Sequence, residues 1–139
     1  MNKEKVYVKS AGVRLDSIEY KTEKVTEDTE NKVIIKEEYK VENVSFSQFE
    51  IKVIRMFYTT PSKLFDGKIV VEIRYELADE TKDNFENEEE LKKYIESKPY
   101  VFVNKTPVGS SISLLAGQIT STFNGMPLWM NPVINGDEN

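Results

Sequence analysis

Cysteine and histidine are both absent from this chain of 139 residues. Without cysteine there are no disulfides, no thiolate nucleophile and no zinc site built on sulfur. Without histidine, the commonest general base and the commonest metal ligand are missing. Carboxylates are numerous, but they lie in loops and on the charged phases of predicted strands, where a hydrated surface explains them better than a catalytic or metal-binding pair. We therefore expect a protein that is not an enzyme and that holds no metal or cofactor.

Long apolar runs and clusters of basic residues are also missing. No run approaches the roughly 20 apolar residues that span a bilayer, and the start, MNKEKVYVKS, lacks the apolar region of a signal peptide. The net charge of −5 disfavours a nucleic-acid partner. The glycines form no phosphate-binding pattern. These absences predict a cytoplasmic protein with no membrane insertion, and the length suits a single domain over residues 1–139.

Alternating apolar and charged residues predict four antiparallel strands, each with one face in water. The four segments are Val6 to Lys24, Val33 to Val44, Phe46 to Pro61 and Ile69 to Leu77. A change of phase near Asp16-Ser17 suggests a β-bulge or bend in the first. The acidic, turn-rich stretch from Thr26 to Lys32 predicts a hairpin loop between the first two strands.

Helical signals follow the strands. Asn87, with Glu90 three residues later, resembles a capping box and starts a short helix that Pro99 limits. A longer helix begins at Thr106-Pro107 and ends at Asn124-Gly125. Strands followed by helices indicate an α+β fold. We expect a four-stranded antiparallel sheet followed by a short helix and a long C-terminal helix packed on one sheet face.

The long helix carries two stripes of residues. The apolar stripe, which we expect to contact the sheet, consists of Val108, Ile112, Leu115, Ile119 and Phe123. The second repeats every four residues and has almost no side chains; it consists of Gly109, Ser113, Gly117 and Ser121. Glycine inside a helix costs roughly 1 kcal/mol relative to alanine, so a steric reason is expected. Tight packing on the chain's own sheet explains this stripe about as well as a subunit interface, which we predict because the apolar stripe already accounts for the sheet.

Two segments outside the helices are unusually apolar. The third strand ends with both faces apolar, at Met56, Phe57 and Tyr58. After the long helix, two prolines bound an extended segment that contains Leu128, Trp129 and Met130. Methionine and aromatic residues are typical of adaptable binding surfaces, so this second segment is a candidate for lining a groove that another chain fills. Packing in the core is the competing interpretation for it.

Two stretches resemble the SecB-type protein-export chaperones and their relatives. They are VRLDSIEY, from Val13 to Tyr20, and SISLLAGQITSTFNGMPLWMNPVI, from Ser111 to Ile134. In that family a helix rich in small and apolar residues runs into a glycine, a proline, an apolar segment and a second proline. Here those places are occupied by Gly125, Pro127, Leu128, Met130 and Pro132.

The resemblance implies an ATP-independent holdase that binds unfolded, apolar client polypeptides in protein export and assembles as a tetramer, a dimer of dimers. Met56, Phe57, Tyr58, Leu128, Trp129 and Met130 would line the client-binding groove. Glu72 and Glu76 stand on the phase that typical members use to dock on the translocation ATPase. Typical members continue into a further C-terminal helix and tail, whereas this chain ends at Asn139. A chaperone dedicated to one client, such as an antitoxin, fits the same residues, and a non-chaperone structural or small-ligand-binding protein with this fold is the alternative of another class.

Overall fold

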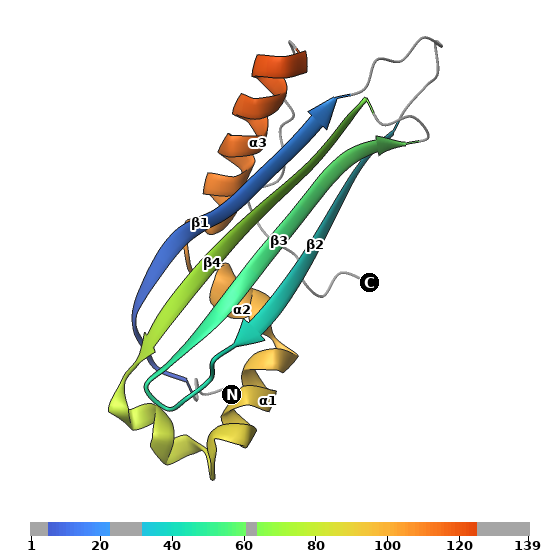
Figure 1. Ribbon diagram of the computed structural model, residues 1–139. Coiled ribbons are helices and arrows are strands. Elements are labelled where there is room, and N and C mark those ends of the chain that lie inside the picture. The colour runs from blue at the N-terminus through green and yellow to red at the C-terminus, as the bar shows by residue number, and fades with distance from the viewer. Residues whose placement is uncertain (1–5, 23–31, 61–63, 125–139) are drawn as a thin grey trace.

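The computed structural model describes residues 6–22, 32–60 and 64–124. Four antiparallel strands form one sheet in the spatial order β1-β4-β3-β2 (Figure 1). Their bounds are β1 Val8–Thr22, β2 Lys32–Glu42, β3 Gln48–Thr60 and β4 Phe65–Leu77. The predicted four-stranded antiparallel sheet is confirmed. The hairpin predicted between the first two strands is wrong, because β1 pairs with β4 and lies at the edge opposite β2.

The two central strands supply most of the core. Their apolar phases are in register, with Ile51 opposite Ile73 and Val53 opposite Val71, and all four side chains are buried. Residues directly opposite each other in antiparallel strands point to the same face. One face of the sheet, here called the helix-side face, therefore carries the core, and the other, the open face, carries the charged phase.

The predicted bulge in β1 is confirmed. The register with β4 shifts between Leu15 and Ser17, which carries Ile18 and Tyr20 onto the phase that Val13 and Leu15 occupied before it. An extra residue in one strand inverts the faces of everything after it. The shift thus keeps β1 apolar toward the helices along its whole length.

Four helical segments follow the sheet. A 3-10 helix, η1 (Asp79–Asn84), precedes α1 (Glu88–Ser97), which is capped as predicted because Asn87 Oδ1 accepts a hydrogen bond of 2.9 Å from the Glu90 N–H. The short helix α2 (Pro99–Val103), which was not predicted, leads to α3 (Val108–Asn124). All three α-helices lie on the helix-side face, with α1 and α2 beside β2, and α3 beside β1 and β4 (Figure 1). No helix in residues 6–22, 32–60 and 64–124 is long and apolar enough to cross a membrane.

The buried face of α3 lies between the two predicted stripes. Val108 and Ile112 are fully buried as expected, but Leu115 and Ile119 are only partly buried. Three members of the small-residue stripe, Gly109, Ser113 and Gly117, are instead buried within the single chain, and only Ser121 is exposed. Among them, Ser113 turns toward the sheet, where its hydroxyl lies 3.5 Å from Nη1 of Arg55, and the subunit interface stays a prediction.

Candidate polypeptide-binding face

The open face of the sheet is built from interstrand ion pairs. Arg14 of β1 lies 2.7 Å from Glu72 of β4, and Arg74 of β4 lies 3.0 Å from Glu50 of β3. Lys52 of β3 and Asp16 of β1 approach to 3.7 Å. Ion pairs at a protein surface stabilise a fold little, typically by about 0–1 kcal/mol each, although the Glu50 side chain itself is buried. Their main effect here is to cover the face with balanced charge.

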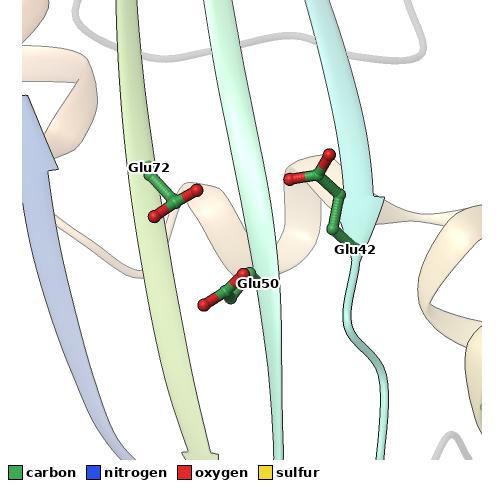
Figure 2. A group of neighbouring side chains, drawn as sticks. All are labelled: Glu42, Glu50 and Glu72. Atoms are coloured by element: carbon green, nitrogen blue, oxygen red, sulfur yellow. The ribbon is translucent and has the colours of Figure 1, made fainter. Parts of the chain in front are cut away.

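Three carboxylates from adjacent strands meet on this face (Figure 2). Glu42, Glu50 and Glu72 place one oxygen atom each within 4.8 Å of the others. Both carboxylate oxygens of Glu50 already accept hydrogen bonds. Its Oε1 accepts one from Asn43, and its Oε2 accepts two from Arg74. The Asn43 hydrogen bond, followed by the Arg74 contacts, lowers the pKa of Glu50 in spite of its burial. Cations and an amide thus already hold two of the three carboxylates.

The two residues predicted to dock the translocation ATPase both lie on β4 and point to the open face. Glu72 is half-buried and bonded to Arg14. Glu76 is exposed and stands opposite Gln48 and Ser10 in the register. Glu76 is therefore the more accessible of the two, and docking stays a prediction.

The predicted groove residues of β3 do not share a surface. Phe57 is fully buried on the helix-side face, where its ring lies 6.2 Å from the rings of Tyr20 and Phe65. Met56 and Tyr58 are half-buried on the open face, where they line a shallow depression of about 540 Å³ whose other walls are mostly charged. The alternation of strand side chains separates neighbours in this way. Leu128, Trp129 and Met130 lie outside the described residues.

Uncovered apolar side chains occur at both edges of the helix-side face. On β1, the exposed fractions are 43% for Val13, 48% for Leu15 and 38% for Ile18; we call these three residues the β1 strip. On β2, they are 47% for Val33 and 41% for Ile35, which we call the β2 strip. The register places both strips on the face that carries the core. Since α1 and α2 lie beside the other end of β2, they leave the β2 strip uncovered (Figure 1).

The sequence analysis did not predict that these strips are exposed, although their apolar residues are visible in the alternation of the two strands. Each belongs to the apolar phase of an edge strand, and a helix set beside one edge of a four-stranded sheet leaves apolar positions exposed elsewhere. Contiguous exposed apolar surface of this kind marks interaction sites more often than chance. On α3, which lies beside β1, Leu114 is 55% exposed.

A buried polar cluster lies between the two strips, under α3. Arg55 of β3 is 1% exposed, although it occupies the apolar phase of its strand. Its Nη2 lies 3.2 Å from Oε1 of Glu37, the residue opposite it on β2, and its Nη1 lies 3.5 Å from the Ser113 hydroxyl of α3. The small side chain of Ser113 leaves room for the guanidinium, which is why the small-residue stripe of α3 turns toward the sheet.

Electrostatics in this cluster are set by burial. Burial lowers the pKa of Arg55, and the Glu37 charge opposes that change. Burial also raises the pKa of Tyr39, whose hydroxyl donates a hydrogen bond of 2.9 Å to Glu37. Glu37 therefore contacts a cation and a phenol at once. The cluster contains one positive and one negative charge.

The strand order and the three helices on one face define an α+β protein with a single four-stranded antiparallel sheet. Its sequence matches no protein-family profile and no curated protein sequence. Among solved structures, it is similar to the Mycobacterium tuberculosis Rv1957 SecB-like chaperone in complex with a ChAD peptide from the Rv1956 HigA1 antitoxin, with a TM-score of 0.64 and 10% identity over 94% of this chain and 88% of that chain. A protein of unknown function from Streptococcus agalactiae is similar with a TM-score of 0.42 and 10% identity, over 88% of this chain and 97% of that one. The likeness to Rv1957 shows that this chain has the SecB-like fold.

Proposed function

We propose that this protein is an ATP-independent chaperone, a holdase that binds unfolded, apolar polypeptide segments on the helix-side face. The observation that carries the proposal is the pair of uncovered apolar strips beside the helices of a SecB-like fold. The similar chaperone Rv1957 was solved with a peptide bound, which supports a polypeptide as the partner. Binding by burial of apolar surface needs no catalytic step, so no enzymatic activity, metal or cofactor is part of the proposal.

The β2 strip is the part of this face that we assign to the client. Val33 and Ile35 keep roughly two fifths of their surface in water. Full burial of such a side chain is worth about 1.5–3 kcal/mol, so covering the exposed part of both contributes about 1–2.5 kcal/mol. A tenfold change in affinity corresponds to about 1.4 kcal/mol. Loss of both side chains should therefore weaken binding by about five- to fiftyfold.

The test is an aggregation and binding assay without nucleotide. The client probe is α-lactalbumin with its cysteines reduced and blocked, which cannot refold, and binding is measured by calorimetry. The double variant Val33→Ser/Ile35→Ser should lose affinity by the factor above. The matched control, Lys32→Ser/Lys40→Ser, changes two exposed residues of the same strand that face the other side and should bind as wild type does. Failure of the wild-type protein to bind the probe or to delay its aggregation would favour the non-chaperone alternative.

The β1 strip is the surface that we assign to a second copy of the chain. Within residues 6–22, 32–60 and 64–124, β1 is an edge strand that pairs on one side only, with β4. Unprotected edges of that kind tend to pair with another chain. Leu15 and Leu114 bring apolar surface to this side. The double variant Leu15→Lys/Leu114→Lys should reduce the mass measured by light scattering while circular dichroism stays unchanged. An unchanged mass would remove the β1 strip as the subunit contact.

A role in export and a dedicated client are the two uses that we propose for such a holdase. Export would add docking on the translocation ATPase through Glu72 and Glu76 in the cytoplasm. The antitoxin peptide bound to Rv1957 supports the dedicated client. Co-purification from cells distinguishes them, since a dedicated chaperone should recover one dominant protein and an export chaperone a broad set together with the ATPase.

A further inference from the structure

The outer side of β2 pairs with no other strand in the part of the chain that the structure describes. In the spatial order of the sheet, β2 has a neighbour on one side only, which is β3 (Figure 1). Its register with β3 is unbroken from Lys32 to Glu42, without a bulge or a proline. In an antiparallel pair, alternate residues direct their N–H and C=O groups toward the partner strand and the others direct theirs away from it. About half of the backbone groups of β2 therefore point out of the sheet.

Solvent reaches this outer edge at both ends of β2. At the end beside the helices, a shallow depression of about 450 Å³ is lined by four consecutive strand residues and by the corner between α1 and α2: Tyr39, Lys40, Val41, Glu42, Glu96 and Pro99. Successive side chains of a strand point to opposite faces, so a depression lined by four of them in a row lies along the edge of β2 and not over one face. At the other end, Val33 and Ile35 of the β2 strip are exposed.

We propose that the client joins the sheet as a fifth strand, with its main-chain N–H and C=O groups hydrogen-bonded to the outward-facing groups of β2. The inference rests on the proposed function and adds the conformation and the chemical groups that are recognised. Strand addition of this kind gains affinity from main-chain hydrogen bonds and specificity from alternate side chains. On the helix-side face, alternate client side chains would lie beside Val33 and Ile35, and this contact covers the β2 strip.

The charges of β2 indicate which client segments fit. Three lysines and three glutamates balance along the strand: Lys32, Lys36, Lys40, Glu37, Glu38 and Glu42. A balanced edge does not select a segment by its net charge, so the apolar strip decides which segments bind. All three lysines belong to the open-face phase, opposite in the register to residues such as Met56. The segment that fits is therefore amphipathic, with apolar side chains on the phase beside the β2 strip and polar side chains on the other.

Amide hydrogen exchange, followed residue by residue by NMR on the full chain, tests the pairing. The probe is a nine-residue peptide of alternating leucine and threonine with acetylated and amidated ends. At about 100 times its dissociation constant, the peptide leaves about 1% of the protein unbound. Exchange of the outward-facing amides of β2 should therefore slow by up to about 100-fold, and the slowed positions should alternate along the strand. The amides of β1, the other edge strand, are the control and should exchange as they do without peptide.

A methylated form of the same peptide tests the hydrogen bonds from the side of the client. Methyl groups on the backbone nitrogens of two leucines and two threonines block donors at both edges of the peptide, whichever direction it runs along β2, and leave its side chains unchanged. At least two hydrogen bonds to β2 are then lost, so calorimetry should show binding weakened by about 5- to 150-fold.

Each other outcome has a definite meaning. A bound peptide that leaves the exchange of β2 unchanged, or a methylated peptide that binds as the unmodified one does, overturns strand addition and places the client on the face of the sheet alone. Outward-facing amides of β2 that are slow before any peptide is added, with a mass that rises with protein concentration, assign the edge to a second copy of the chain and overturn the assignment to the client. If the protein binds neither the unmodified peptide nor blocked α-lactalbumin, the proposed function itself fails, and calorimetry shows this before exchange is measured.

Discussion

Adding one methyl group at Gly67 should destabilise the protein through its contact with Phe57. These residues face each other across β3 and β4. A Cβ atom on Gly67 would fall 2.8 Å from Cε1 of the Phe57 ring and closer still to Cζ and Cε2. Non-bonded carbon atoms prefer roughly 3.5–4.0 Å, so the ring would have to move. It is fully buried between Tyr20 and Phe65 and has little room to do so.

The expected cost of Gly67→Ala follows from two opposing effects. Overpacking a well-filled core costs about 1–3 kcal/mol, whereas alanine is favoured over glycine inside a strand by roughly 0.5–1 kcal/mol. The net loss of unfolding free energy should be about 1–2 kcal/mol. With a urea dependence of about 1–3 kcal/mol per molar for small proteins, the unfolding midpoint should fall by about 0.3–2 M.

A double-mutant cycle isolates the contact. In a Phe57→Leu background the new methyl group has space, so Gly67→Ala should become neutral or stabilising by up to about 1 kcal/mol, which is the propensity gain alone. Gly12→Ala is the matched control, because a Cβ atom at Gly12 meets nothing within 4 Å. Equal effects of Gly67→Ala in both backgrounds would refute the contact. That result would also reopen the question whether Phe57 binds a client, because the placement described above holds its ring in the core.

Three further outcomes are expected. Asn87→Ala should lower the free energy of unfolding by about 1 kcal/mol, as loss of an N-cap does, while Asn87→Ser should keep most of it in the same urea titration. Folding lowers the pKa of Glu50, so the contribution of its carboxylate to stability is complete above the ordinary value of 4.5 and is lost as the pH falls below it. Glu50→Gln should therefore flatten the dependence of the urea midpoint on pH between 7 and about 3. An unchanged dependence would contradict the lowered pKa. Gly117→Leu should unfold the chain by overpacking and not merely dissociate subunits, which circular dichroism and light scattering together decide.

Local patterns in the sequence were enough for the strands and the capped helices. Each of these signals depends on residues that are close together in the sequence. The structure contains three of them: the alternation of Ile69 to Leu77, the phase change at Asp16-Ser17 and the Asn87 cap. The order of strands depends on contacts between distant segments instead. The sequence of a turn-rich connection is the same kind of sequence whether the two strands that it joins pair with each other or lie at opposite edges of the sheet. The connection after β1 therefore does not predict that β1 pairs with β4.

The rotation of α3 differs from the predicted one for a related reason. Spacing alone groups apolar residues on one face of a helix, and it does not show which side chains the sheet presents to that helix. At Arg55 the sheet presents a long charged side chain, and the small residues around Ser113 make room for it. The helix is consequently turned so that Leu115 and Ile119 lie at the border of the buried face.

Three anomalies in the sequence have one common explanation in the structure. Glu37 interrupts the apolar phase of β2, Arg55 interrupts that of β3, and α3 carries glycine and serine where a helix would ordinarily carry larger residues. Either interruption alone would suggest an irregular strand. The register of the β2–β3 pair, however, sets Glu37 directly opposite Arg55, so the two interruptions form one ion pair, and Ser113 stands where a larger side chain would collide with it. Burying an ion pair in this way contributes little to stability. The three departures from the apolar pattern thus meet one requirement, which is room for a buried ion pair between β2, β3 and α3.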